Sequence, residues 1–177
     1  LALGQKDFGE NYLQEAREKI PALPPEARWH FIGRLQSSKV RFLPGLFSVL
    51  HTLDSLELAA RLDRRLKEQN QSLEVYIQVN ISGEKTKGGL DPKDLPAFLD
   101  HLPQFTSLKA CGLMTMPPYD PDPEASRPFF RALHELKEKT APQLPGLSMG
   151  MSGDFRAAVE EGATIVRIGT SLFGERP

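Results

Sequence analysis

The sequence contains very little cysteine, and its few histidines are scattered. Cys111 is the single cysteine among 177 residues, so the chain offers no intramolecular disulfide and no thiolate pair for a metal. The four histidines do not follow the spacing of zinc ligands. We therefore expect no metal site, and we expect a reducing compartment such as the cytoplasm.

Long apolar runs and charge of one sign are missing as well. No run approaches the ~20 apolar residues of a transmembrane helix, so a membrane partner is not expected. The 22 basic and 23 acidic side chains give a net charge of -1, which argues against a nucleic-acid partner. With 40% hydrophobic residues the chain can bury one core, and we expect a single domain over residues 1–177.

Short apolar runs alternate with helix-like segments along the chain. Seven runs have the composition of buried strands: DFGENY (7–12), WHFIG (29–33), FSVLHTLD (47–54), LEVYIQVNI (73–81), LKACGLMTM (108–116), GLSMGMS (146–152) and TIVRIGT (164–170). Segments 56–70 and 127–140 have the apolar spacing of amphipathic helices, and 35–43, 94–101 and 154–163 also look helical. This alternation predicts an α/β fold with a parallel sheet and helices outside it.

A (β/α)8 barrel of the TIM type fits the alternation, although it needs one strand more than the seven counted here. Because Leu1 is not a methionine, we expect the first βα unit of such a barrel to lie upstream of Leu1. A doubly wound open sheet, which tolerates seven strands, is the alternative architecture. In a barrel, functional residues lie at the carboxyl ends of the strands.

Small and hydroxyl-bearing residues follow the last two predicted strands. Ser152 comes after one of them, and Gly169 and Thr170 come after the other. The loops after the last two strands of a TIM-type barrel commonly bind phosphate through backbone N–H groups and hydroxyls at a helix N-terminus. The pattern predicts an anion site, and the alternative is that these residues only form turns and caps.

Arg167 lies inside the last predicted strand. Alternation places it on the same face as Gly169. A guanidinium group that points into a barrel is costly unless it meets an anion or a strong acceptor. The arginine therefore either faces the predicted anion site or forms an ion pair with Asp54, Glu84 or Glu161.

Two histidines, His30 and His51, lie in apolar runs of the sequence. We interpret both as core histidines that bond to the backbone, in preference to ligands of a small molecule.

Several motifs occur together in the order of a known family. FGENYLQE, WHFIGRLQSSK, HTLDS, IQVNISGEKTKGG, GLMTM, LSMGMSGD and VRIGTSLFG extend from Asp7 to Gly174. With these motifs the chain resembles the pyridoxal-phosphate homeostasis proteins. The resemblance implies a barrel of PLP fold type III, like the N-terminal domain of alanine racemase. It also implies that the chain binds pyridoxal 5′-phosphate (PLP) and serves intracellular vitamin B6 homeostasis by holding and delivering the cofactor without catalysis of its own.

The resemblance also implies roles for individual residues. Arg167 would face the pyridine nitrogen of PLP and keep it unprotonated, which makes the ring a weaker electron sink. The phosphate would lie on Ser152, Gly169 and Thr170. Asn11 would lie at the mouth near the cofactor, and Met149 or Met114 would pack along the ring.

No lysine of the sequence is assigned to a Schiff base with PLP. Lys6, Lys39, Lys85 and Lys87 do not match the family's lysine, which is expected upstream of Leu1. The residues present would hold PLP or inorganic phosphate through the anion site. The expected partners are PLP and PLP-dependent apoenzymes, and the expected state is a monomer.

Two other functions are compatible with the same barrel. A PLP-dependent amino-acid racemase or decarboxylase of this type would carry an additional β domain that contributes catalytic groups. A sugar-phosphate enzyme would need carboxylates at the mouth. Asp54 and Asp154 are the only acids well placed for that role, and we expect Asp154 to cap the helix that follows it.

Overall fold

The computed structural model describes residues 1–84 and 86–174. Its seven strands form one sheet in which every neighbouring pair is parallel and the strand order follows the chain. The strands are β1 (Asp7–Glu10), β2 (Arg28–Phe31), β3 (Val49–Leu53), β4 (Leu73–Gln78), β5 (Leu108–Met114), β6 (Gly146–Met151) and β7 (Ile165–Arg167). Each lies within one of the seven predicted runs or overlaps it. The sequential order is that of a barrel and excludes the doubly wound alternative.

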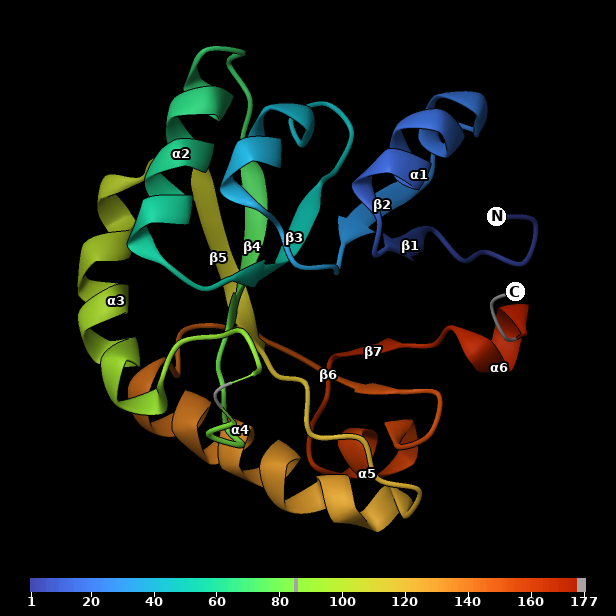
Figure 1. Cartoon of the computed structure of the whole chain (residues 1–177), viewed down its shortest axis with the longest axis vertical. Coiled ribbons are helices and arrows are strands. Elements are labelled where there is room, and N and C mark those ends of the chain that lie inside the picture. The colour runs from blue at the N-terminus through green and yellow to red at the C-terminus, as the bar shows by residue number, and fades with distance from the viewer. Residues whose placement is uncertain (85, 175–177) are drawn as a thin grey trace.

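Helices connect the strands and lie outside the sheet (Figure 1). They are α1 (Leu13–Lys19), α2 (Leu56–Lys67), α3 (Leu95–His101), α4 (Arg127–Thr140), α5 (Phe155–Glu160) and α6 (Thr170–Phe173). Helix α2 begins after Ser55, whose hydroxyl accepts a hydrogen bond from the Leu58 N–H at 3.2 Å. The segment predicted as a helix around residue 39 is instead a 3-10 helix, η2 (Ser37–Phe42).

The sheet is strongly curved. The His51 ring in β3 and the Ser148 hydroxyl in β6 are 2.7 Å apart, although β4 and β5 lie between these strands. On a flat sheet, three strand spacings would separate the two backbones by about 14 Å. The side chains therefore meet across a concave interior, as in a barrel of the TIM type.

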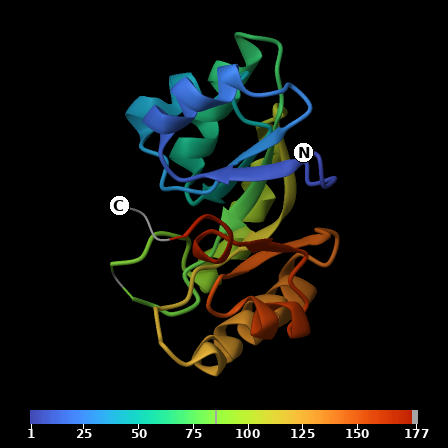
Figure 2. The same cartoon turned by 90° about the vertical axis from the view of Figure 1, so that its right-hand side faces the viewer.

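The first and last strands form the two edges of the sheet. Both lie on the right-hand side of Figure 1, whereas β4 and β5 run through its centre. Figure 2 looks at this side, with the blue N-terminal strands above the red C-terminal strands. The predicted barrel architecture is thus confirmed for the seven strands that the chain supplies.

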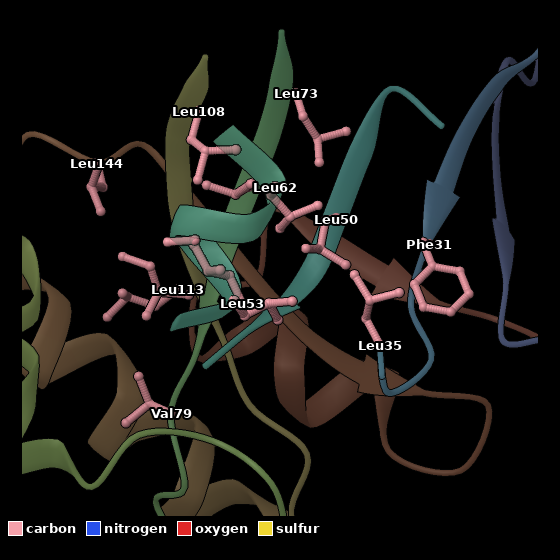
Figure 3. Packing of buried hydrophobic residues seen from close by; sticks show 14 of the residues in the cluster. Phe31, Leu35, Leu50, Leu53, Leu62, Leu73, Val79, Leu108, Leu113 and Leu144 are labelled. Atoms are coloured by element: carbon pink, nitrogen blue, oxygen red, sulfur yellow. The ribbon is translucent and has the colours of Figure 1, made fainter. Parts of the chain in front are cut away.

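The two faces of the sheet differ in composition. The outer face packs against the helices in one large apolar cluster, in which Leu62 of α2 lies beside Leu50 of β3 (Figure 3). Both side chains are fully buried. A second, small cluster of Val49, Tyr76 and Met114 lies apart from the first. Because Val49 and Leu50 are successive strand residues, they point to opposite faces, and the small cluster lines the concave interior.

Within residues 1–84 and 86–174, no helix is long and apolar enough to cross a membrane. In the same part of the chain, no group of three or more histidine, cysteine, aspartate or glutamate residues is arranged to hold a metal ion.

Candidate functional site

Arg167 ends β7 and points into the concave interior. Ile165, two residues earlier, packs against the interior cluster, so alternation along the strand places the arginine on that side, as predicted. Its Nη1 donates to the Ser148 hydroxyl at 2.8 Å, and its Nη2 donates to the Thr115 carbonyl oxygen at 3.0 Å. The side chain is held from two other strands, β6 and the end of β5.

The alternative role of Arg167 in an ion pair is not realised. Within the described part of the chain, no salt bridge joins Arg167 to Asp54, Glu84 or Glu161, and Glu161 instead pairs with arginines of α4. Burial lowers the pKa of Arg167 to about 10, an effect that the charge of Asp154 opposes. The guanidinium is therefore still cationic at neutral pH, and it lies among neutral acceptors.

A chain of polar side chains connects Arg167 with the far edge of the sheet. Ser148 Oγ lies 2.7 Å from His51 Nδ1, and His51 Nε2 lies 2.8 Å from His30 Nδ1. His30 Nε2 in turn lies 3.0 Å from a carboxylate oxygen of Asp7 in β1. Ser148 and His51 are fully inaccessible to solvent. The two histidines are buried, as predicted, but the prediction that they bond to the backbone is wrong: their partners are side chains of other strands.

The surroundings of the two histidines oppose protonation. Burial lowers the pKa of His51 to about 2, with the positive charge of Arg167 acting in the same direction. Burial also lowers the pKa of His30, although the hydrogen bond to Asp7 favours the charged form. The Tyr76 ring stacks on the His51 ring at a centroid distance of 4.7 Å and covers one face of it. Both imidazoles are therefore neutral at physiological pH.

The residues of the predicted anion site lie in the loops after β6 and β7. The Ser152 hydroxyl accepts hydrogen bonds from the N–H groups of Gly169 at 3.2 Å and Ser171 at 3.3 Å, which brings Ser152, Gly169 and Thr170 together as expected. A Cβ atom added to Gly153 or Gly169 would meet no atom within 4 Å, so the space beside these glycines is open. Backbone N–H groups and hydroxyls around an open, partly exposed space are a donor set that fits a phosphate group.

Asp154 does not cap α5 with its side chain, contrary to the prediction. Its carboxylate instead accepts a hydrogen bond from the Met151 N–H at 2.7 Å, back toward β6. The backbone of Asp154 departs from the extended conformation of a typical capping residue, which accounts for the difference. The carboxylate therefore fixes the turn that carries Ser152.

Asn11 lies at the carboxyl end of β1. It is exposed and lines a cavity of about 230 Å³ together with Arg34 and Lys39. A Cβ atom on Gly33 would lie 2.0 Å from the Asn11 carbonyl oxygen, so only glycine allows the ends of β1 and β2 to approach this closely. A second cavity, of about 550 Å³, lies beside Asp54 and Arg34. Both cavities open at strand ends, which is the predicted functional side of the barrel.

The two methionines of interest lie on opposite faces of the sheet. Met114 belongs to the interior cluster, on the side of Arg167. Met149 is fully buried in the outer cluster, together with Ala157 and Ala158 of α5. The structure therefore does not bring Met149 together with the predicted ligands, because Ser148, its neighbour in β6, occupies the inward position.

The lysines of the sequence lie at several different places. Lys6 precedes β1 and is exposed, Lys39 lies in η2, and Lys87 lies in the loop after β4. Lys85 lies outside the described residues.

Sequence analysis missed several residues that hold Arg167 and the histidines. Ser148 and Thr115 supply the acceptors of the guanidinium, Asp7 ends the polar chain, and Tyr76 covers His51. A signal was present, since Ser148 is a lone polar residue at an inward position of an otherwise apolar run. Its partner could not be read from that run, because it depends on the curvature of the sheet.

Comparisons with known proteins support a common origin with PLP-related barrels. The sequence profile of the family described as "Alanine racemase, N-terminal domain" matches residues 1–177. A pyridoxal phosphate homeostasis protein of Aquifex aeolicus is 48% identical over 178 residues, which are 98% of this chain and 78% of the relative. The human pyridoxal phosphate homeostasis protein is 42% identical over 191 residues, with 98% of this chain and 69% of the relative covered.

Solved structures of related proteins have the same fold as this chain. PipY of Synechococcus elongatus PCC7942, in a structure with PLP bound, superposes with a TM-score of 0.86 at 40% identity, over 98% of this chain and 84% of PipY. An alanine racemase of Clostridium difficile 630 superposes with a TM-score of 0.77 at 13% identity, over 99% of this chain and 47% of the racemase. The racemase likeness concerns the fold alone.

Proposed function

Because this chain belongs to the family of pyridoxal phosphate homeostasis proteins, we propose that it binds PLP and serves the homeostasis of this cofactor. The observation that carries the proposal is the pairing of two features at the carboxyl ends of β6 and β7. One is a cationic Arg167 held among neutral acceptors, and the other is the open loop pair around Ser152. Binding of PLP by PipY, at 40% identity, supports the same assignment.

The phosphate of PLP is held by the loops after β6 and β7 in this proposal. The N–H groups of Gly169 and Ser171, which now meet the Ser152 hydroxyl, are donors of the kind that bind phosphate oxygens. The neighbouring Thr170 supplies a further hydroxyl. Gly153 and Gly169 leave the space beside the loops free, so an anion can approach the backbone.

In this proposal, Arg167 faces the nitrogen of the pyridine ring and thereby orients the ring. When bound, PLP supplies an aldehyde conjugated with an electron-withdrawing ring. A guanidinium donates hydrogen bonds and does not release its proton at neutral pH, so it favours an unprotonated ring nitrogen and a weaker electron sink. Asn11 lines the mouth at the end of β1, and Met114 lines the interior. Met149 is left out of this ligand set, because it packs against α5.

The chain acts in this proposal as a monomeric carrier that passes PLP to apoenzymes and has no catalysis of its own. The names of its relatives support a homeostatic role. Of the two carboxylates expected at the mouth, Asp154 fixes the turn after β6, and Asp54 lines the cavity beside Arg34. A weak electron sink is also the property expected of a protein that stores the cofactor unchanged.

Equilibrium dialysis with PLP tests this function. We expect the wild-type chain to bind PLP and Arg167→Ala to bind it about tenfold more weakly, with a changed absorbance spectrum, because a charge-assisted hydrogen bond is lost. Arg131→Ala, which removes an arginine from the exposed face of α4, is the matched control and should bind as wild type does. A wild-type chain that fails to bind PLP would overturn the proposal, and an unchanged Arg167→Ala variant would make the arginine structural.

Two further measurements examine the phosphate site and the absence of catalysis. Ser152→Ala should weaken competition by inorganic phosphate, whereas Ser38→Ala, an exposed serine of η2, should not. An unaltered phosphate affinity in Ser152→Ala would show that this residue does not belong to the site.

Incubation of the PLP-loaded chain with single enantiomers of amino acids should give no racemisation. Measurable turnover would show that the protein is an enzyme and not a carrier.

A further inference from the structure

The polar chain beneath Arg167 has only one consistent arrangement of hydrogen atoms. An ionised Asp7 has acceptors alone, so His30 must carry its proton on Nε2, the atom that faces this carboxylate at 3.0 Å. A neutral His30 then has a bare Nδ1, which can only accept. His51 must donate from Nε2 across the 2.8 Å contact, and its own Nδ1 must also be bare.

The other end of the hydrogen-bond chain fits this direction. Arg167 has no acceptor, so its Nη1 donates to the Ser148 oxygen. The single hydroxyl hydrogen of Ser148 then remains for His51 Nδ1, which lies 2.7 Å away and needs a donor. The proton positions that follow from Asp7 are therefore compatible with the contact between Arg167 and Ser148. Every bond runs from the cation toward the anion, an arrangement in which neighbouring hydrogen bonds polarise and strengthen one another.

We propose that Ser148, His51, His30 and Asp7 form a one-way hydrogen-bond chain that positions Arg167, with both histidines held as Nε2–H tautomers. The part of this inference that concerns the ligand rests on the proposed binding of PLP. Ser148, His51 and His30 are positioning residues, because they act on the cofactor only through Arg167. Asp7 is the anchor of the chain at the first strand.

Because the hydrogen-bond chain is buried, the loss of one of its members would disturb the orientation of Arg167. Ser148 and His51 are fully inaccessible, so water cannot replace a missing partner. Tyr76 stacks on the His51 ring and limits its rotation. Ser148 and the Thr115 carbonyl hold two different nitrogens of one guanidinium, which fixes its plane. Loss of the serine leaves Arg167 with the Thr115 contact alone and lets the plane rotate.

The same molecule contains a built-in comparison for the tautomers. His101 Nδ1 lies 2.7 Å from the Ala97 carbonyl oxygen, and His134 Nδ1 lies 2.8 Å from the Glu161 carbonyl oxygen. Because a carbonyl only accepts, these two rings must carry the proton on Nδ1. Two histidines of one tautomer and two of the other are therefore expected in one spectrum.

The first experiment is nitrogen-proton NMR of the imidazoles in the full chain without ligand, at about pH 8, where an ordinary histidine is neutral. His30 and His51 should show protonated Nε2 and bare Nδ1, and His101 and His134 should show the reverse. Assignment uses the His30→Gln and His51→Gln variants. An Nδ1–H tautomer or a doubly protonated ring at either buried position would overturn the one-way chain, whether or not the protein binds PLP.

The second experiment compares Ser148→Ala with Ser126→Ala, which removes a buried hydroxyl beside α4. Ser148→Ala should broaden the Arg167 guanidinium resonances in the unliganded protein. It should also weaken PLP binding about threefold to tenfold and move the spectrum toward that of Arg167→Ala. Ser126→Ala should change none of these. Sharp, unshifted Arg167 signals in a folded Ser148→Ala variant would overturn the positioning role.

The two experiments separate failure of the chain from failure of the proposed function. If wild-type protein binds no PLP but shows the expected tautomers, and Ser148→Ala shows the expected Arg167 broadening, the proposed cofactor is wrong and the positioning role of the hydrogen-bond chain stands. If the protein binds PLP but its buried histidines show the opposite tautomers, the proposed function stands and the proposed hydrogen-bond chain is wrong.

Discussion

Leu50 and His51 are neighbours in β3, yet their side chains serve different environments. Leu50 packs outward against α2 in the large apolar cluster, whereas His51 points inward into the polar chain beneath Arg167. The outer face contains most of the buried apolar side chains and thus most of the favourable burial energy. The inner face contains polar groups whose value depends on mutual orientation. Stability and ligand recognition are therefore assigned to opposite sides of the same strands.

The largest effect is expected from a change on the outer face. Leu50→Ala should lower the free energy of unfolding by about 2–5 kcal/mol, because it removes a fully buried side chain and leaves a cavity beside Leu62. Denaturation with urea measures the change. In protein that remains folded, PLP affinity and the histidine tautomers should stay as in wild type. A loss of affinity as large as that of Arg167→Ala would show that the two faces are not separable.

A pH series isolates the contribution of the inner face. The pKa of His51 is lowered from 6.5 to about 2 in the folded chain, so between these values the unfolded chain binds a proton that the folded chain does not. Stability is complete above about pH 6.5 and decreases as the pH falls, by up to about 1.4 kcal/mol per pH unit for this residue. His30, whose pKa is also lowered, acts in the same direction.

The measurement compares unfolding by urea in the wild type and in His51→Gln from roughly pH 7 to pH 4. Carboxylates titrate in both proteins, so the difference between the two curves reports the histidine. The wild-type curve should be the steeper one. Parallel curves would mean that His51 is accessible to protons in the folded state.

A change that touches neither face should have the smallest effect. Ser55→Ala removes the hydroxyl that accepts from the Leu58 N–H at the start of α2. We expect a loss of about 1 kcal/mol in the free energy of unfolding, with PLP binding unchanged. Thermal unfolding and dialysis provide the two numbers. An altered PLP affinity would indicate that α2 transmits strain to the inner face through β3.

Sequence reasoning predicted the outer face better than the inner one. The seven strands, the long helices α2 and α4 and the inward direction of Arg167 follow from local alternation, which depends only on neighbours in the chain. The proximity of Ser152, Gly169 and Thr170 was predicted because barrels of this type commonly bind an anion at the loops after their last two strands. Each of these features is encoded within about 15 residues.

The partners of the inner residues could not be predicted in the same way. The contact between His51 and Ser148 depends on the curvature of the sheet, and no local pattern encodes which inward residues meet across it. Met149 was expected on the ligand side, although the inward position of Ser148 requires it to face α5. The role of Asp154 also differs from the prediction, since the backbone around it was read as an ordinary cap.

The bond between His51 and Ser148 also has a consequence for the kinetics of folding. Its two residues are 97 positions apart in the chain, and the strands between them must assemble before the side chains can meet. Closing so long a segment costs entropy early, and folds rich in such distant contacts form slowly. The environment of Arg167 therefore appears only when the sheet is complete. The rate at which its native guanidinium resonance appears during refolding therefore reports the last step of folding, in which the two ends of the sheet become linked.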